Sequence, residues 1–483
     1  MSKTEAAGIR EQVGHPIIDV DAHMLEFMPA VFPYLRDALG PGQFEAFRKQ
    51  GPLVRRDLPS MSADRALASR IPQTAWWGCT NDSLERATIM LPQLFAERME
   101  DLGFDYCVQF TTNALSQCSV PDGELRTGIC RGFNDYYAEI YRPVRDRIAP
   151  AGLIPMHTPE EAIAELDHCA SIGLKVVVLP EAVLRTVDEI PPDVPNGILW
   201  PGQSHWLDRY GLDSLYDYDP VWQRAQQHGF VICFHGQLAN VPGTYTSPTN
   251  YVYNHIGMFA SLMAPLCKSL FLGGATRRNP NQPFAFLECG VSWAAQMLCD
   301  TIEHWEKRRT EALDRLDPAR LDFDALDELV VRYGGPFAKI DESDRRAAYE
   351  HEAIDSRPPE EPDDFVHLAV KSKQDLCDLF SENLYFGCEA DDRGVAAAFA
   401  PSNPQGTKLK AMFSSDIGHW DVVDQTAVVP DAHGLIEKGV LNEDQFRDFT
   451  FCHSAEMLLK ANSSFFEGTT LEGEAAKLLR LEG

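Results

Sequence analysis

Short apolar, β-rich runs recur along this chain, separated by stretches with helical patterning. Eight runs stand out, at residues 17–23, 104–111, 149–157, 175–180, 231–236, 284–290, 383–389 and 410–416. Strands that alternate with helices pair in parallel, because each crossover helix returns the chain to the same end of the sheet. A closed parallel barrel needs this number of strands. The sequence therefore predicts an α/β fold, a (β/α)₈ TIM barrel.

One β–helix–β unit can be followed through residues 149–180. Thr158 is a suitable N-cap, Pro159 suits the first helical position, and Glu161 stands where it would complete a capping box. Apolar residues follow with helical spacing, and Gly173 is a typical helix end. The strand KVVVLP begins directly afterwards, so the spacing predicts a helix that connects two parallel strands.

Two stretches are longer than the loops of a minimal barrel. Residues 24–100 follow the first predicted strand and include Trp76 and Trp77, and residues 305–380 lie between the sixth and seventh strands. We predict one domain over residues 1–483 with these two insertions, because barrels commonly exceed about 250 residues as a single unit. Excursions after barrel strands lie at the catalytic face, where they form lids or subunit contacts.

Composition narrows the possible partners. The formal net charge of the 483 residues is −29, which repels nucleic-acid phosphates and anionic lipid head groups. The 12 cysteines include no Cys-x-x-Cys pair, so we expect free thiols in a reducing compartment. The first residues lack an apolar leader, and no stretch is predicted to span a membrane, so we expect a cytoplasmic protein.

The first predicted strand ends in three ionisable residues at alternate positions, Asp19, Asp21 and His23. Alternate side chains on a strand share a face, so all three are predicted to point into the barrel. Burial there would be costly without a cation or a partner charge. This pattern favours a metal site, although the two aspartates would also serve as loop caps.

Two further strands end in polar side chains. His235 ends the fifth predicted strand and Asp416 ends the eighth. Alone, His235 would be interpreted as a hydrogen-bonded core histidine, and Asp416 as a helix N-cap. In a barrel, however, all strand ends converge on one mouth, so both can join the residues of the first strand. Asp416 can bind a metal there or accept a proton.

The segments IDVDAH, FHG, ECGVSW and SSDIGHWD resemble the amidohydrolase-related family, in the branch of aminocarboxymuconate-semialdehyde and resorcylate-type decarboxylases. The segments NYVYNHIG, LFLGG and CEADD extend the match over most of the barrel. The resemblance implies a divalent metal (zinc, manganese or iron) on Asp21, His23, His235 and Asp416. In the family the position of Asp21 and that of Glu288 are histidines, so this site is richer in carboxylate than the family's.

Other polar residues near the predicted mouth have less certain roles. The family's bridging lysine on strand four has no counterpart, because Lys175 lies at the wrong end of that strand. A second metal would then use Glu26 or Glu288, although Glu26 also suits a helix start. His255 is a ligand, a substrate contact or a loop histidine, and His419 would act beside Asp416. Further candidates for the mouth are Trp420, Asp421, Cys388, Glu389, Arg185 and His157.

Three functions fit these patterns. The resemblance favours metal-dependent hydrolysis or decarboxylation of a small organic acid or aromatic substrate, with Asp416, His255 and His419 as catalytic residues. The carboxylate-rich ligand set favours a dinuclear iron or manganese–iron monooxygenase on the same barrel. The third is a non-catalytic subunit that supports a related enzyme. The insertions and the family's habit of pairing predict a homo-oligomer, or a hetero-oligomer with a related barrel subunit.

Overall fold

The computed structural model describes residues 3–50, 62–70, 80–187, 205–236, 247–317, 320–354 and 362–482. Eight parallel strands form one sheet in the order β1-β2-β3-β4-β7-β8-β9-β10. They are β1 (Ile18–Met24), β2 (Tyr106–Thr111), β3 (Ile148–Leu153), β4 (Val176–Pro180), β7 (Val231–His235), β8 (Phe284–Phe286), β9 (Leu384–Glu389) and β10 (Lys410–Ser414). Each predicted run overlaps one of these strands, so the predicted barrel is confirmed.

Backbone hydrogen bonds bring the two ends of this sheet together. The amide of Asp416 donates to the carbonyl of Asp21 at 2.9 Å, and the amide of His23 donates to the carbonyl of Ile417 at 2.7 Å. The first strand is thereby fixed against the segment that follows the last one. Residues far apart in the sequence, near positions 21 and 416, become neighbours at the closure of the barrel.

Nearly all the residues of the barrel strands are buried, as expected when helices cover a parallel sheet. Aromatic rings stack along consecutive strands, with Phe234 against Phe286 at 5.6 Å between ring centres and Phe286 against Phe386 at 5.8 Å. An antiparallel hairpin that the sequence patterns do not predict, β5 (Val183–Thr186) with β6 (His205–Asp208), follows β4.

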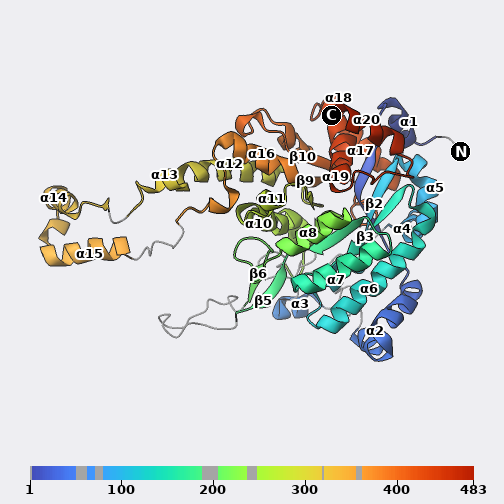
Figure 1. The fold of residues 1–483 in the computed structure, drawn as a ribbon, viewed down its shortest axis with the longest axis horizontal. Helices are drawn as coiled ribbons and strands as arrows, with labels where there is room; N and C mark the ends of the chain where they lie inside the picture. The colour runs from blue at the N-terminus through green and yellow to red at the C-terminus, as the bar shows by residue number, and fades with distance from the viewer. Residues whose placement is uncertain are drawn as a thin grey trace.

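Helices surround the barrel and fill its long connections (Figure 1). Between β1 and β2 lie α2 (Met28–Gln50), α3 (Ala63–Ser69), α4 (Ser83–Met90) and α5 (Pro92–Leu102). Between β8 and β9 lie α12 (Ser292–Arg308), α13 (Thr310–Leu313), α14 (Phe323–Tyr333), α15 (Glu342–Ile354) and α16 (Lys373–Asn383). Figure 1 shows α14 and α15 at the end of an arm that projects from the barrel.

The other α-helices flank the remaining strands and the N-terminus. They are α1 (Glu5–Gln12), α6 (Gly123–Ile140), α7 (Pro159–Ser171), α8 (Asp219–His228), α9 (Tyr251–His255), α10 (Met258–Leu272), α11 (Ala275–Arg278), α17 (Val428–Glu437), α18 (Glu443–Arg447), α19 (His453–Ala461) and α20 (Glu472–Glu482). The predicted helix is α7, where the hydroxyl of Thr158 accepts a hydrogen bond from the amide of Glu161. The carboxylate of Glu161 bonds Arg126 instead of completing a capping box.

One stretch, Tyr251–Leu272, is long and apolar enough to cross a membrane by length and composition alone, with a mean hydropathy of 1.4. The expectation that no stretch reaches that length was therefore wrong. This is weak support for a membrane, because α10 buries Leu266, Leu270 and Phe271 in the protein core.

Candidate metal centre

Six ionisable side chains gather at the carboxyl ends of four barrel strands. They are Asp21 and His23 on β1, His235 at the end of β7, Glu288 just after β8, and Asp416 and His419 just after β10. Their ligand atoms fall into two groups: one contains Asp21, His23 and His235, and the other contains His23, Glu288, Asp416 and His419. Within each group the atoms lie within 4.8 Å of one another. Both groups have the spacing to hold a metal ion.

His23 stands at the centre of the cluster. Its Nε2 lies 3.5 Å from an oxygen of Asp21 and 3.5 Å from an oxygen of Asp416. The Nε2 of His235 lies 3.2 Å from the same nitrogen of His23 and 3.0 Å from an oxygen of Glu288. A single ion beside His23 is therefore within reach of side chains from four strands.

His419 lies closer to this cluster than the sequence suggested. Its Nδ1 is 2.5 Å from an oxygen of Asp416 and 3.9 Å from an oxygen of Glu288. The structure thus places this predicted catalytic histidine among the candidate ligands. Its side chain keeps 16% exposure, whereas that of Asp416 keeps 2%, so His419 forms the solvent side of the cluster.

Two of these residues have unusual backbone geometry. Glu288 has a φ of 55° and Asp416 a φ of 51°, a left-handed conformation that non-glycine residues rarely adopt. Such conformations gather at functional sites, where the surrounding structure holds them. Gly418 has a φ of 115°, and a Cβ there would meet the carbonyl oxygen of His23 at 2.8 Å. A glycine is therefore required where the loop after β10 crosses β1.

The near polar neighbours of the buried carboxylates are the imidazole nitrogens of the cluster, at 2.5–3.5 Å, and the structure shows few other hydrogen-bond partners for them among the described residues. Both side-chain oxygens of Asp21 and of Asp416, and Oε2 of Glu288, are buried without a hydrogen bond. Burial raises the pKa of all three carboxyls well above the usual range, and neighbouring carboxylates add to the effect at Asp416. A bound cation would remove both penalties. With nitrogen and oxygen donors together, the site fits a divalent metal.

Asp19 has a different role from the other residues of its strand. One of its oxygens accepts from the amides of Ser415 and Asp21, at 3.0 and 3.1 Å, and the other accepts from the hydroxyl of Ser415 at 2.5 Å. The pairing of β1 with β2 shifts register between Asp19 and Ala22, so the alternation of faces is interrupted there. Asp19 ties together the two strand ends that carry Asp21 and Asp416.

We expect Ser415→Ala to lower the free energy of unfolding by about 1–3 kcal/mol, because a buried oxygen of Asp19 loses its hydroxyl donor. We also expect metal affinity to fall roughly 10- to 100-fold, as is typical when a group that orients a ligand is removed. Chemical denaturation and metal titration measure the two effects. Ser454→Ala is the control, because the Ser454 hydroxyl is equally buried but has no hydrogen-bond partner. Equal behaviour of the two variants would contradict this role of Asp19.

The structure does not bring Glu26 or Lys175 to the metal centre. The Glu26 carboxylate accepts from the hydroxyls of Thr111 and Tyr137 and from the amide of Asn113, so both its oxygens are occupied. The structure therefore does not place Glu26, a predicted candidate ligand, in either ligand group of the described residues. Lys175 donates to the carbonyl of Phe465 at 2.7 Å, consistent with its predicted place at the far end of its strand.

His255 belongs to an aromatic wall beside the centre. Its ring lies 5.3 Å from Trp420 and 5.6 Å from Phe259, whose ring is 5.9 Å from His235. Its Nε2 lies 4.0 Å from an oxygen of Asp421, and burial lowers its pKa. Neither ligand group among the described residues includes His255, so its position fits a substrate contact better than a ligand. The contribution of Phe259 had no signal in the sequence.

A small acidic cavity of about 120 Å³ adjoins the centre through Asp416. Its lining includes Glu389 from β9 and Asp421, two predicted mouth residues. Burial and neighbouring carboxylates raise the pKa of Glu389 to about 8. The other carboxylates of this wall were not among the predicted site residues: Asp391 lies in CEADD, Asp424 in the segment after SSDIGHWD, and Asp431 on α17.

The remaining predicted mouth residues have structural partners. Arg185 donates to Asp208 at 2.6 Å and to the carbonyl of His157 at 3.1 Å, so it holds the hairpin against the loop after β3. Burial lowers the pKa of His157 to about 3. Cys388 is buried in β9. Trp76 and Trp77, which belong to the predicted insertion after the first strand, lie outside the described residues.

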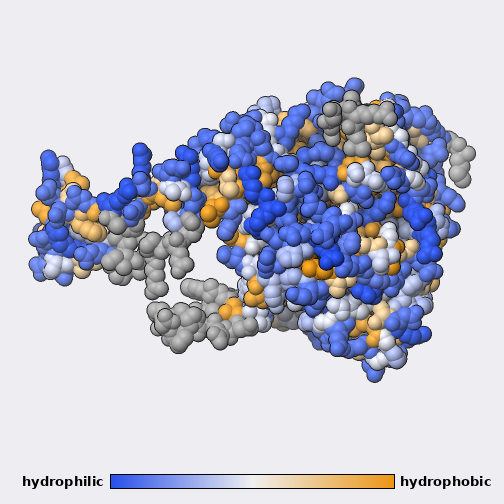
Figure 2. Space-filling model, in the orientation of Figure 1, coloured by the Kyte–Doolittle hydropathy of each residue, from blue (hydrophilic) through white to orange (hydrophobic). Residues whose placement is uncertain are grey.

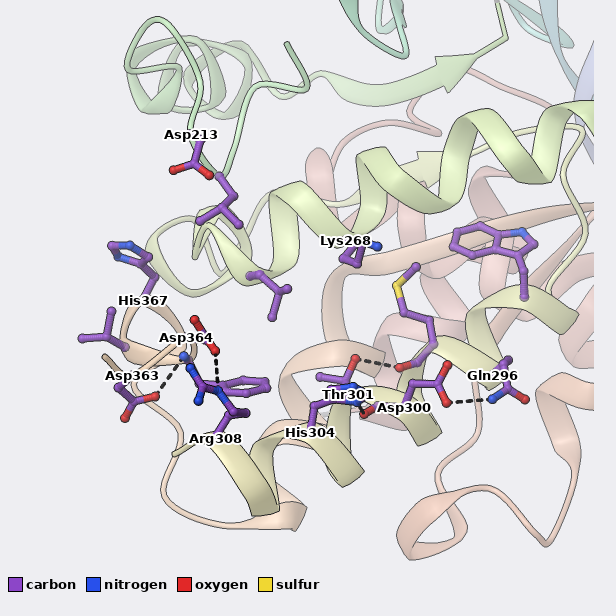
Figure 3. A pocket seen from close by; sticks show the side chains of 16 residues that line it. Asp213, Lys268, Gln296, Asp300, Thr301, His304, Arg308, Asp363, Asp364 and His367 are labelled. Atoms are coloured by element: carbon purple, nitrogen blue, oxygen red, sulfur yellow. Dashed lines mark hydrogen bonds and ion pairs between the residues drawn. The ribbon is translucent and has the colours of Figure 1, made fainter. Parts of the chain in front are cut away.

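A larger cleft of about 820 Å³ lies on the outer side of the barrel, at the root of the projecting arm (Figure 3). It is lined by residues of α10, α12 and the segment 363–367, among them Lys268, Asp300, His304 and Arg308. None of the six candidate ligands lines it. The metal centre is therefore separate from this cleft.

Comparison with known proteins places the chain in a family. A family model described as Amidohydrolase matches residues 92–361, more than half of the chain. No curated protein sequence matches the chain.

Several solved structures are similar to this chain at low sequence identity. An amidohydrolase from Mycobacterium avium subsp. paratuberculosis is 14% identical with a TM-score of 0.49, over 92% of this chain and 99% of that one. A 2,6-dihydroxybenzoate decarboxylase from Rhizobium is 14% identical, and a 5-carboxyvanillate decarboxylase from Sphingomonas paucimobilis is 16% identical. Both have a TM-score of 0.46 over 92% of this chain and 98% of theirs. Because the family model matches residues 92–361, the chain belongs to the amidohydrolase family.

Proposed function

We propose that this chain is a divalent-metal-dependent enzyme that hydrolyses or decarboxylates a small organic acid or aromatic substrate. The observation that carries the proposal is the group of buried carboxylates without hydrogen-bond partners, beside two histidines at the mouth of the barrel. Their raised pKa values oppose ionisation unless a cation is bound. A stable fold has no need for this arrangement, whereas a metal site does.

The shared position of His23 favours one ion. Both ligand groups include His23, and its Nε2 is the atom close to Asp21, Asp416 and His235. Since one imidazole nitrogen has a single lone pair, it binds one ion. When bound, such an ion polarises a substrate oxygen and lowers the pKa of a water molecule.

Asp416 and His419 are the best placed residues to move a proton. The 2.5 Å separation of their Oδ1 and Nδ1 atoms allows them to share one proton. The pair opens to solvent at His419, where a proton can be exchanged with water. In hydrolysis the pair would take a proton from the attacking water. In decarboxylation, as the carbon–carbon bond breaks and CO₂ leaves, the pair would supply the proton that replaces it on carbon.

The aromatic wall indicates the shape of the substrate. Tyr251, His255 and Trp420 lie within 5.4 Å of one another by ring centres, and Phe259 connects them to His235. Flat apolar surfaces favour a planar or aromatic group by stacking. A ring held there would present a polar substituent toward the metal ligands.

One observation favours the alternative, a dinuclear iron or manganese–iron monooxygenase. The centre contains three carboxylates, Asp21, Glu288 and Asp416, with Glu389 and Asp421 nearby. One divalent ion leaves this group with excess negative charge, and hard oxygen ligands suit iron and manganese. A second ion would balance the charge.

Metal content of the purified chain tests the proposal. We expect about one divalent ion per chain by plasma mass spectrometry, and turnover of carboxylated aromatic or acyl substrates without oxygen uptake. Two iron or manganese ions per chain, with oxygen consumed during turnover, would replace the proposal by the monooxygenase. Full metal occupancy without turnover, followed by activity once a related barrel subunit is added, would establish the supporting subunit instead.

A further inference from the structure

The arm formed by residues 320–354 contains helices α14 and α15, and none of its apolar side chains with described burial is fully buried. Among residues 320–350, where burial is described, only Asp327 and Arg345 are buried. The guanidinium of Arg345 donates to both oxygens of Asp327, at 2.7 and 2.8 Å, and joins the two helices. Helix pairs ordinarily gain stability from a shared apolar face. An ion pair alone is a weak substitute for such a face.

On α14 the side chains of Phe323, Leu326 and Val330 are half-buried, but six other large apolar side chains of the arm are exposed. They are Leu321 (47% exposed), Leu329 (55%), Val331 (52%), Tyr333 (69%), Phe337 (64%) and Ile340 (46%). These six are a large share of the 21 exposed large apolar side chains among the described residues, and they fall within 20 positions. Figure 2 shows the resulting apolar patches on the projecting arm. Concentration of this kind marks an interaction surface.

We propose that the arm is a dimerisation element, and that its partner is the arm of a second copy of this chain. Leu329 and Tyr333 lie one turn apart on α14, so they form a stripe on one face of the helix. A helical hairpin with an apolar outer face is complementary to an identical hairpin across a two-fold axis. Two such hairpins pack as four helices.

The available area is sufficient for a stable pair. The six exposed side chains offer on the order of 500 Å² of apolar surface, judged from the area that such side chains bury. A standard interface buries about 800 Å² per partner, of which roughly 60% is apolar. The arm therefore provides about the apolar area that one side of a standard dimer requires.

The charge of the chain favours contact through the arm over contact between barrels. Two chains of formal charge −29 repel each other when their surfaces meet. The arm projects away from the barrel (Figure 1), so the bodies of two paired chains stay apart while the tips meet. Repulsion falls off over about 10 Å at moderate salt, so this separation removes most of it. The remaining repulsion weakens as salt is added, and we expect the dimer to tighten with ionic strength.

Light scattering after size-exclusion chromatography of the full chain tests the inference. We expect a mass near twice 54.0 kDa for the wild type. The double variant L329D/Y333D should run as a monomer, with a dissociation constant at least ~100-fold weaker, because it places two charges in the apolar centre of the interface. Leu84→Asp is the matched control, since Leu84 on α4 is 53% exposed and lies outside the arm, and it should leave the dimer intact.

The circular dichroism spectrum and the metal content of the double variant must match those of the wild type. A monomeric mass then reports loss of pairing and not loss of the fold. If the double variant is unfolded, the single variant Phe337→Asp provides the same test outside the helices. A monomeric wild type at ~10 µM would overturn the inference, as would a dimer that survives both sets of substitutions. Neither result depends on what reaction the metal centre performs.

Discussion

Replacing His23 with glutamine is expected to release the metal and abolish turnover. Its Nε2 lies within 3.5 Å of an oxygen of Asp21 and of Asp416, and 3.2 Å from His235, so every candidate ligand set includes it. We expect at least a ~100-fold loss of metal affinity, which exceeds the usual effect of removing a group that only orients a ligand. Metal titration with a competing chelator measures the change.

The choice of glutamine and one control variant separate metal loss from damage to the fold. Glutamine nearly preserves the volume of the fully buried His23, whereas alanine would leave a cavity at the barrel closure. His433→Ala is the control, because His433 is a partly exposed histidine on α17 whose nearest carboxylate oxygen, from Glu437, is 3.9 Å away. The control should keep its metal. A folded His23→Gln chain that retains one ion per chain would show that the ion is bound elsewhere.

The barrel could be predicted from the sequence because each of its strands is a run of residues whose pattern can be identified without knowing its neighbours. Parallel strands covered on both faces are continuous apolar runs, so Lys175–Pro180 and Val231–His235 are visible without any knowledge of their neighbours. The site followed from one rule of topology, since the carboxyl ends of barrel strands share a mouth. That rule brought His235 and Asp416 to His23, and the structure places them there.

Contacts between residues far apart in the sequence could not be predicted. Glu26 looked available to a metal, but its hydrogen bonds come from Thr111, Asn113 and Tyr137, more than 80 positions away. Asp19 shares the alternation of Asp21 and His23, yet a register shift in β1 and a bond to Ser415, 396 positions later, give it a different role. No local pattern records such contacts, because the burial that makes them necessary exists only in the folded chain.

The spacing of residues in the sequence also could not show which residues adopt the left-handed backbone conformation. Nothing in ECGVSW or SSDIGHWD distinguishes Glu288 and Asp416 as left-handed, because both are ordinary acidic residues at strand ends. The antiparallel hairpin β5–β6 escaped prediction for a related reason: its strands have four residues each, which is too short for alternation to be recognised.

Asp416→Asn is expected to stabilise the metal-free protein while it abolishes metal binding. Burial and four nearby carboxylates raise the pKa of Asp416, and an amide of the same shape has no charge to bury. A raised pKa means that the folded chain binds more protons than the unfolded chain, so its stability falls as pH rises. The advantage of the amide should be absent near pH 4 and grow toward pH 8, by about 1.4 kcal/mol for each unit of the shift.

Thermal unfolding in the presence of a chelator, from pH 5 to pH 8, measures this difference. Asp19, with a pKa raised to about 6, and Glu389, with a pKa raised to about 8, also make the stability of the wild type fall as pH rises over this range. Glu303→Gln is the control, because the Glu303 side chain is 66% exposed and its substitution should not change the slope. When metal is added, the order must reverse, since binding to the folded state stabilises only the wild type. If the metal-free Asp416→Asn chain were the less stable one at pH 8, Asp416 would be a structural carboxylate, and the metal centre would lose its ligand from the end of β10.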